Sequence, residues 1–500
     1  MKHIRALFLA ATGLLLSFSP ALAQESEITI GRAVSTTAMD PGFLREAATI
    51  VDNVFDTLVM RDENMQLVSG LAESWKAVDD TTWEFRLKKG VKFHNGEDFD
   101  AEAVKFTIDR IIDPEANAPT LSYIRTVTGV DVVDPYTVRI TTDGPDPLLP
   151  TRMSRYPTYV VPPKYVKAVG NDVFAREPVG TGPYAFVEFI PDQHVILKAN
   201  PDYWRGKPSI DRVTFRAIPD GTARVTALLT GEADFVESVP VDLAPIVEQS
   251  ADADLVLVKN GGLTVYLGLV MKAPPLDKLK VRQALDAAID RKSIVDNILR
   301  GMATAKGTQV GPADFGYLAI PPTPYDPARS RQLLAEAGYP DGFTIKMEST
   351  HRYMKDSEVA QAIAQQFGDV GVTIEQEVLD WSVYTQEVPR PGPIYMLGWG
   401  STQTLDADAA VYAIMRSGEP YSTVGIPALD TLLDQSRKIV DPEARKKVLE
   451  DIQKVAAETV PLLTLYQEDA LYGKAKDVVF AGRPDARIPI YDIKLTTDAQ

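Results

Sequence analysis

The stretch TWEFRLKKGVKFHNG at residues 82–96 is the most informative part of this sequence. Residues 82–87 alternate between apolar and polar side chains, which is the period of a half-buried β-strand. Residues 88–90 form a turn, the alternation then resumes, and Asn95-Gly96 is a strong turn signal. The stretch therefore predicts a dense β region in the first part of the chain.

On either side of this stretch the pattern predicts strands first and an α/β region later. Asp100 is placed to cap a helix over residues 101–111. Additional elements before residue 264 are predicted as strands at 28–30, 130–141 and 213–218, a helix that runs into a short strand over 47–60, and a helix at 221–230. From residue 264, predicted strands at 265–271, 343–347, 372–378, 394–397 and 460–466 alternate with helices at 281–300, 357–367, 426–437 and 442–458. This alternation indicates parallel pairing through βαβ crossovers.

Composition excludes several classes of function. The 500 residues predict about three folding units. A balance of 52 basic to 69 acidic residues, a net charge of −17, argues against nucleic acid or an anionic membrane as a partner. The absence of cysteine excludes disulfides, thiolate nucleophiles, zinc–cysteine sites and iron–sulfur clusters. We expect no cofactor.

The first 23 residues have the form of a secretory signal. Lys2 and Arg5 precede an apolar run at residues 6–16, and Ala21-Leu22-Ala23 fits a cleavage site after Ala23. No cysteine follows the run, so lipid anchoring is excluded, and no later stretch is long and apolar enough to span a bilayer. We expect the mature protein to be exported without a membrane anchor, most simply into a bacterial periplasm.

The sequence contains few residue patterns that are typical of a catalytic site. The three histidines after the signal segment lack the spacing of a metal motif, and each is interpreted as a surface or turn residue. The sequence GTGPYA at 180–185 fits the loose dinucleotide pattern, but Pro183 leads into an alternating strand instead of a helix. We therefore interpret it as a structural turn. The chain is predicted not to be an enzyme, although composition alone leaves a secreted hydrolase open.

Several segments together resemble one protein family. Residues 82–96, with LAESW at 71–75, PVGTGPY at 178–184, NPDYW at 200–204 and VRQAL at 281–285, are similar to the peptide/nickel family (family 5) of extracellular solute-binding proteins. These are receptors of ABC importers for dipeptides, oligopeptides and glutathione. One departure is Met271-Lys272, where members of the family usually carry an asparagine.

The resemblance implies an α/β, two-lobed periplasmic-binding-protein fold with an extra subdomain in the first lobe. On this basis residues 1–23 are the signal peptide, 24–263 with 469–500 form lobe I, and 264–468 form lobe II. The extra β-rich subdomain is expected at about 55–190. Two strands, near 264–271 and 460–470, are expected to cross between lobes, and lobe closure would bury a ligand.

The function implied is a monomeric periplasmic receptor that delivers short peptides to an ABC permease and, through it, to ATPase subunits. The same role for an opine, a nickel chelate, haem or an oligosaccharide stays open. No nucleic acid, free metal or membrane insertion is expected.

The resemblance also points to ligand contacts. The loop after the predicted strand 394–397 contains Trp399, Asp406 and Asp408, and in peptide-binding relatives the matching loop supplies a carboxylate for the ligand's α-ammonium. Asp408 is the first candidate and Asp406 the second, with a helix cap as the alternative role for Asp406. Trp399 is either a wall of the site or part of the core. We expect Asp408→Asn to weaken peptide binding tenfold without changing the melting temperature.

Three more candidates complete the predicted site. Arg352 follows the strand predicted at 343–347 and could bind a ligand carboxylate through a bidentate fork, since relatives often use an arginine there. From the first lobe, Thr37 and Met39 are expected to contact the ligand through backbone and side chain.

Overall fold

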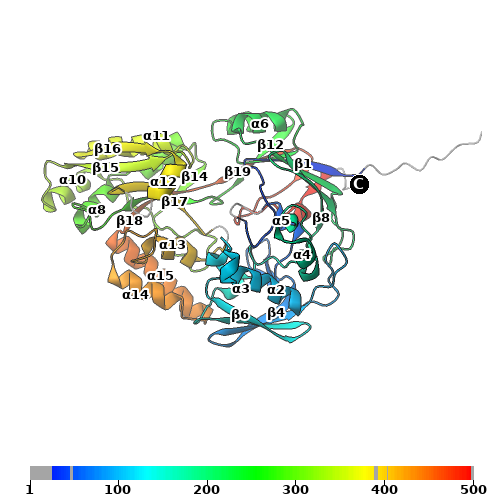
Figure 1. Cartoon of the computed structure of the whole chain (residues 1–500). Coiled ribbons are helices and arrows are strands. Elements are labelled where there is room, and N and C mark those ends of the chain that lie inside the picture. Colours follow the sequence, from blue (N-terminus) through cyan, green and yellow to red (C-terminus); the bar gives the residue numbers. More distant parts are fainter. Residues whose placement is uncertain (1–24, 45–48, 388–391, 402–403, 497–500) are drawn as a thin grey trace, which may run out of the picture.

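The computed structural model describes residues 25–44, 49–387, 392–401 and 404–496, so the predicted signal segment lies outside the described residues. Two large sheets organise the molecule, and Figure 1 shows them side by side with helices around each. We call the part built on the seven-stranded sheet, together with the smaller β-rich unit before residue 184, the first lobe, and the part built on the six-stranded sheet the second lobe. Each has its own hydrophobic core.

The seven-stranded sheet is mixed. Its central strand, β1, pairs in parallel with β10 and β11, and the remaining pairs are antiparallel. The strand order is β12 (Ala253–Val258), β19 (Ala470–Ala475), β11 (Phe235–Glu237), β1 (Glu27–Arg32), β10 (Arg212–Ala217), β9 (His194–Ala199) and β8 (Tyr184–Ile190). Helices α1 (Val51–Val54), α4 (Pro163–Val169), α5 (Asn171–Phe174), α6 (Gly221–Leu229) and α7 (Ala244–Glu248) belong to this lobe.

The six-stranded sheet combines both pairing modes. Strands β15, β16 and β17 are parallel, as the alternation predicts, whereas β13 is antiparallel to both neighbours. The order is β14 (Ala303–Ala305), β18 (Leu462–Glu468), β13 (Thr264–Leu269), β17 (Ile394–Trp399), β15 (Phe343–Thr350) and β16 (Val372–Leu379). The helices are α8 (Leu279–Ala287), α9 (Arg291–Ser293), the π-helix η3 (Ile294–Ile298), α10 (Pro327–Glu336), α11 (Asp356–Gly368), α12 (Trp381–Glu387), α13 (Ala407–Met415), α14 (Pro427–Ser436) and α15 (Pro442–Thr459).

One predicted helix differs from the structure. The apolar face beginning at Val281 predicts a helix that runs on to a stop at Gly301, but α8 ends at Ala287. Asp290 then caps a new helix by accepting a hydrogen bond from the Ser293 N–H at 2.9 Å. The cap competes with continuation of the helix, since an aspartate side chain satisfies a free backbone N–H.

Residues 82–87, which the alternating pattern predicts as a strand, form β5 (Thr82–Leu87) of a separate antiparallel sheet. The strand order in this sheet is β4 (Ala72–Asp79), β5, β7 (Thr137–Thr142) and β6 (Val127–Asp134). Helix α2 (Ala101–Ile112) covers it, and Asp100 caps this helix as predicted by accepting from the Ala103 N–H at 3.1 Å. The sheet and helix share a third hydrophobic core. Because β8 belongs to the seven-stranded sheet, this β-rich unit ends before residue 184, earlier than the predicted limit of 190.

The remaining elements are short. They are strands β2 (Val59–Arg61), β3 (Leu67–Ser69), β20 (Val478–Val479) and β21 (Lys494–Leu495), helix α3 (Leu149–Arg152), and 3₁₀ turns η1 (Pro114–Ala116), η2 (Leu121–Tyr123) and η4 (Ile490–Asp492).

The predicted structural turn at 180–185 is held by His94. The Gly180 N–H donates to Nδ1 of His94 at 3.3 Å, and Nε2 lies 2.9 Å from the Gly182 carbonyl oxygen. Burial lowers the pKa of His94 to about 4, so the ring is neutral at physiological pH. A β carbon on Gly180 would lie 2.0 Å from the Val54 carbonyl oxygen, which explains why glycine stands there. His94 is thus a satisfied turn residue, as the sequence indicates.

The chain passes between the two large sheets twice. Residues 259–263 connect β12 to β13, and Asp469 connects β18 to β19. The two crossings lie side by side, since the Gly262 N–H donates to the Glu468 carbonyl oxygen and the Glu468 N–H to the Leu263 carbonyl oxygen, both at 2.9 Å. Figure 1 shows the β18–β19 segment running from one lobe to the other. These two strands form the covalent hinge of the described chain.

Candidate functional site

A cavity of about 700 Å³ lies between the lobes. The first lobe contributes Arg61 with its following loop and Thr151, and the second lobe contributes Asp314, Asp406 and Arg445. A second cavity, of about 850 Å³, lies on the first-lobe side and shares Arg61 with the first one. Cavities of this size accommodate small organic molecules or short peptides.

Arg61 ends strand β2 and reaches from the first lobe to the second. Its Nη1 donates to the Met65 carbonyl oxygen at 2.5 Å, and its Nη2 donates to the carbonyl oxygen of Thr404 in the opposite lobe. Its Nε is buried and has no hydrogen-bond partner. Among the described residues, no carboxylate lies within ion-pair distance of this guanidinium. Burial lowers the pKa of Arg61 to about 10, and nearby Arg487 adds to this effect.

Asp314 faces the same cavity from the second lobe and is 6% exposed. Its Oδ2 accepts from the Gly311 N–H at 2.7 Å, and its Oδ1 accepts from the Ser401 hydroxyl. No cation forms an ion pair with it within the described part of the chain. Burial raises the pKa of Asp314 to about 6, because the hydrogen bonds and the more distant Lys306 offset the loss of hydration only in part.

Asp406 is the N-cap of α13, which confirms the capping role considered for it. Its Oδ1 accepts from the Asp408 N–H at 3.0 Å. Both of its oxygens also pair with Arg445, with Nη1···Oδ2 and Nη2···Oδ1 distances of 2.7 Å. Asp406 lines the interlobe cavity, but a buried arginine already neutralises its charge.

Asp408 lies one residue into the helix and forms a second bidentate ion pair. Its oxygens accept from Nε and Nη2 of Arg437 at 2.7 and 2.9 Å. Burial by itself would raise the pKa of Asp408, but the Arg437 guanidinium outweighs burial and holds that pKa below its usual value. Asp408 is therefore ionised and paired inside the second lobe.

The other predicted residues line neither of these two cavities. Trp399 donates from Nε1 to the Ala409 carbonyl oxygen at 2.8 Å and packs against the second-lobe core. Arg352 is exposed, with its guanidinium 5.2 Å from the centre of the Trp381 ring. Thr37 is exposed, and Met39 is fully buried in the first-lobe core. A ligand-binding role for any of these residues stays a prediction.

The structure places Arg61 and Asp314 at the cavity, and sequence reasoning missed both. Arg61 directly follows an apolar strand, a position from which it could have been suspected. Asp314 lies in a Gly-Pro loop and has no feature that separates it from the other 68 acidic residues.

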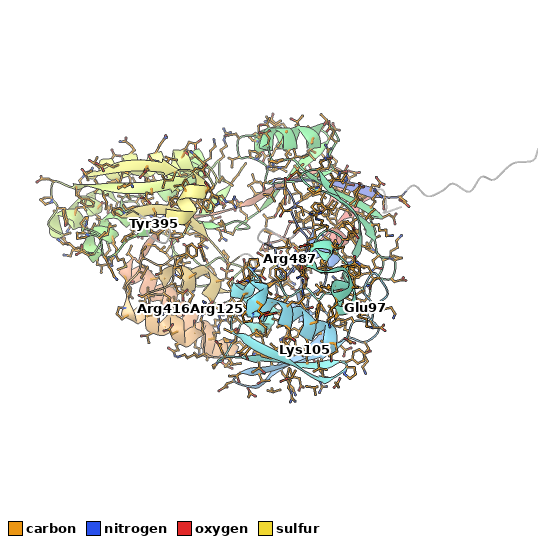
Figure 2. All side chains as sticks on the ribbon, viewed as in Figure 1. Glu97, Lys105, Arg125, Tyr395, Arg416 and Arg487 are labelled. Carbon is orange, nitrogen blue, oxygen red and sulfur yellow. The ribbon has the colours of Figure 1, made fainter. Side chains whose placement is uncertain are left out.

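Two charged groups around the second cavity, Asp56 and Arg487, have polar partners within the first lobe. Asp56 accepts hydrogen bonds from Thr181, Tyr203 and Trp204, each at 2.9 Å. Arg487, labelled in the interior of the molecule in Figure 2, donates to the Ser154 carbonyl oxygen at 2.7 Å and has Asp52 4.0 Å away.

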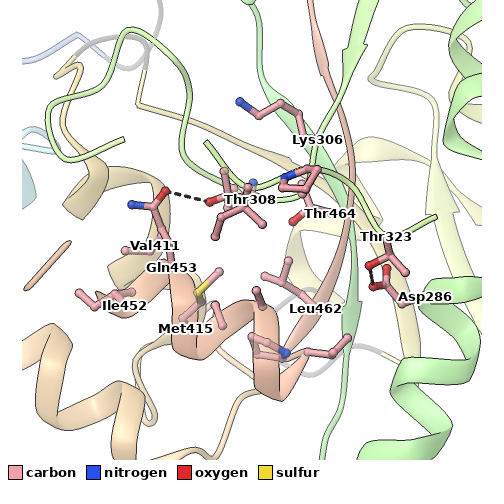
Figure 3. A pocket seen from close by; sticks show the side chains of 18 of the residues that line it. Asp286, Lys306, Thr308, Thr323, Val411, Met415, Ile452, Gln453, Leu462 and Thr464 are labelled. Atoms are coloured by element: carbon pink, nitrogen blue, oxygen red, sulfur yellow. Dashed lines mark hydrogen bonds between the residues drawn. The ribbon is translucent and has the colours of Figure 1, made fainter. Parts of the chain in front are cut away.

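A third, smaller cavity lies inside the second lobe, between β18 and the helices α13 and α15 (Figure 3). Its volume is about 90 Å³, and the Thr308 hydroxyl donates across it to Gln453 Oε1 at 3.1 Å. A space of this size has room for a few water molecules and is too small for a peptide. Within the described residues, no cluster of three or more acidic or histidine side chains is arranged to hold a metal ion.

The sequence profile of "Bacterial extracellular solute-binding proteins, family 5 Middle" matches residues 66–422. The chain belongs to family 5 of the bacterial extracellular solute-binding proteins. This confirms the resemblance seen in the sequence. The glutathione-binding protein GsiB of Salmonella paratyphi A is 30% identical to this family 5 protein over 508 residues, which cover 98% of each chain. GsiB of Pectobacterium atrosepticum is 29% identical over 95% of each chain.

Solved structures confirm the two-lobed fold of this family 5 protein. HbpA2 from Haemophilus parasuis superposes with a TM-score of 0.85 at 25% identity, covering 94% of this chain and 99% of that one. A dipeptide-binding protein from Pseudoalteromonas sp. SM9913, in complex with Met-Leu, gives a TM-score of 0.79 at 23% identity, covering 94% and 100%. The relatives are binding proteins. A search of the described helices finds none with the length and apolar character of a membrane span.

Proposed function

We propose that this family 5 protein is a periplasmic receptor that binds glutathione or similar short peptides and delivers them to an ABC import permease. The interlobe cavity of about 700 Å³ carries this proposal, because two lobes joined by only two short crossings contribute to its walls. A ligand that contacts both walls stabilises the closed arrangement, and closure is a signal that a permease can recognise.

The similarity to GsiB supports a peptide ligand, since this relative covers the whole length of the chain and is named for glutathione. The protein acts without chemical turnover, as a monomer that reaches the periplasm through its cleaved signal segment and works with a permease and ATPase subunits. The division into lobe I at residues 24–263 with 469–500 and lobe II at 264–468 belongs to the same proposal.

The first experiment is mass spectrometry of the ligand released from protein purified without denaturation, followed by calorimetric titration of stripped protein. We expect glutathione or mixed short peptides, and binding that raises the melting temperature. At a hundredfold excess over Kd, the added stability is about 2.7 kcal/mol. Recovery of a single opine, chelate, haem or oligosaccharide, with no heat from any peptide, would refute the peptide ligand while preserving the receptor role.

A further inference from the structure

Among the charged side chains of the interlobe cavity that are at least partly buried, Asp314 and Arg61 form no ion pair within the described chain. Asp314 is 94% buried yet forms hydrogen bonds only with a hydroxyl and a backbone N–H. Burying an ionised carboxylate without a cation is costly, so such groups persist where a ligand completes the pair.

Arg61 is the positively charged group of the cavity that forms no ion pair with a described residue. Its two hydrogen bonds go to the Met65 and Thr404 carbonyl oxygens, and its buried Nε donates to nothing. A guanidinium presents a planar fork of donors that fits a carboxylate, and backbone carbonyls use only part of that capacity.

The carboxylates expected to bind the ligand's ammonium are already occupied. Asp406 and Asp408 each form a two-bond ion pair with an arginine of the same lobe, Arg445 and Arg437 respectively. Releasing either would leave a partly or fully buried arginine unpaired. A cationic ligand group therefore gains more at Asp314, where no ion pair has to be broken.

Gln467 gives Asp314 a second acceptor for an ammonium. Its Oε1 is buried without a hydrogen-bond partner. Around the point where a β carbon on Gly311 would stand, Gln467 Nε2 lies at 3.1 Å, and Gln467 Oε1 and Asp314 Oδ2 each lie at 3.2 Å, so the Gln467 amide and the Asp314 carboxylate border the same point. An ammonium has three hydrogens to donate, and two acceptors on one side suit it.

We propose that Asp314 binds the ammonium and Arg61 a carboxylate of one zwitterionic ligand, so that the ligand links the second lobe to the first. This inference rests on the proposed function and specifies how its ligand is held. Because the anchors come from different lobes, a ligand with both charges favours closure more than a ligand with one. In the closed complex the ligand carboxylate competes with the Thr404 carbonyl oxygen for Nη2 of Arg61.

The test combines variants with masked ligands in calorimetric titration. The probes are glutathione, its N-acetyl derivative, which lacks the ammonium, and its diethyl ester, which lacks both carboxylates. For the wild-type protein we expect each masked probe to bind at least tenfold more weakly than glutathione. Asp314→Asn should bind glutathione at least tenfold more weakly and lose its preference for glutathione over the N-acetyl derivative. Arg61→Gln should bind glutathione at least tenfold more weakly and lose its preference for glutathione over the diethyl ester.

Controls separate ligand contact from structure. Asp341→Asn removes an exposed charge at a residue that lines neither cavity and should keep all wild-type ratios. If Arg61 were only a latch between lobes, Arg61→Gln would weaken glutathione and its diethyl ester by equal factors, and that result would overturn the assignment. If Asp314→Asn still preferred glutathione over its N-acetyl derivative as strongly as the wild type, the assignment of Asp314 to the ammonium would be overturned. Absence of binding by the wild type to all three probes would overturn glutathione as the ligand, and this inference with it, whereas the receptor role is tested separately by the ligand recovered from the purified protein.

Discussion

At the scale of single residues, the buried carboxylate of Asp314 lines the interlobe cavity and lowers the stability of the ligand-free protein when it is ionised. Burial raises its pKa to about 6, and the charged groups facing it are Lys306, Asp406 and Arg61. The folded protein therefore holds a proton here more tightly than the unfolded chain does. The contribution of this carboxyl to stability is full below about pH 4 and is lost as the pH rises through 6.

Asp314→Asn should consequently stabilise the ligand-free protein at pH 7.5, by on the order of 2 kcal/mol, and leave its stability at pH 4 nearly unchanged. Denaturant unfolding at both pH values measures this difference. The exposed Asp341→Asn serves as the control. A variant that is less stable than wild type at pH 7.5 would contradict the view that the charge of Asp314 is uncompensated.

Asp408 shows the opposite situation, since its charge is compensated inside the lobe. Asp408→Asn leaves Arg437 without its carboxylate, and we now expect a loss of stability instead of an unchanged melting temperature. The loss should be on the order of 2 kcal/mol, because Arg437 is 27% exposed and water offsets part of the effect. Thermal unfolding measures it. The more exposed Arg416–Asp434 pair gives the control Asp434→Asn, for which we expect a change below about 1 kcal/mol.

At the scale of elements, the hinge strand β18 ends in a carboxyl with a shifted pKa. Burial raises the pKa of Glu468 to about 7, and the nearby carboxylate of Asp356 also raises this pKa. Two groups act in the opposite direction: the Met354 N–H, which donates to Glu468 at 2.7 Å, and the guanidinium of Arg352. Stability from this group is present below about pH 4.5 and is lost as the pH rises through 7.

Glu468→Gln should keep the hydrogen bond from Met354 and remove the titration. We expect the variant to exceed wild type in unfolding free energy by on the order of 2 kcal/mol at pH 8.5 and to match it near pH 4.5. Chemical denaturation across this range is the measurement, with the exposed Glu458→Gln as a control. A constant difference between variant and wild type at all pH values would show that the carboxyl does not titrate in this range.

At the scale of the whole molecule, the proposed function requires the lobes to close about the two crossings. Small-angle scattering should show a smaller radius of gyration with saturating glutathione, moving toward the roughly 23 Å expected for a compact chain of this length. Arg61→Gln should contract less at equal saturation, because its ligand is anchored in one lobe. Identical radii with and without ligand would argue against closure.

The sequence by itself determined the features that depend on neighbouring residues and on family patterns. The alternation in residues 82–87, the Asp100 cap and the turn at residues 180–185 are local, and the structure contains each of them. Period and capping act over a few residues, so one stretch of chain carries all the information they need. The family assignment rests on the same stretches.

Only the tertiary structure decided which charges are free. Asp408 meets Arg437 29 residues later, and Asp406 meets Arg445 39 residues later. Those pairings turn two apparent ligand contacts into internal ion pairs, while Arg61 and Asp314, far apart in sequence, come to line one cavity. The physical reason is that a charge is free or paired according to the side chains that surround it in space, and the packing of whole elements, not local pattern, sets those surroundings.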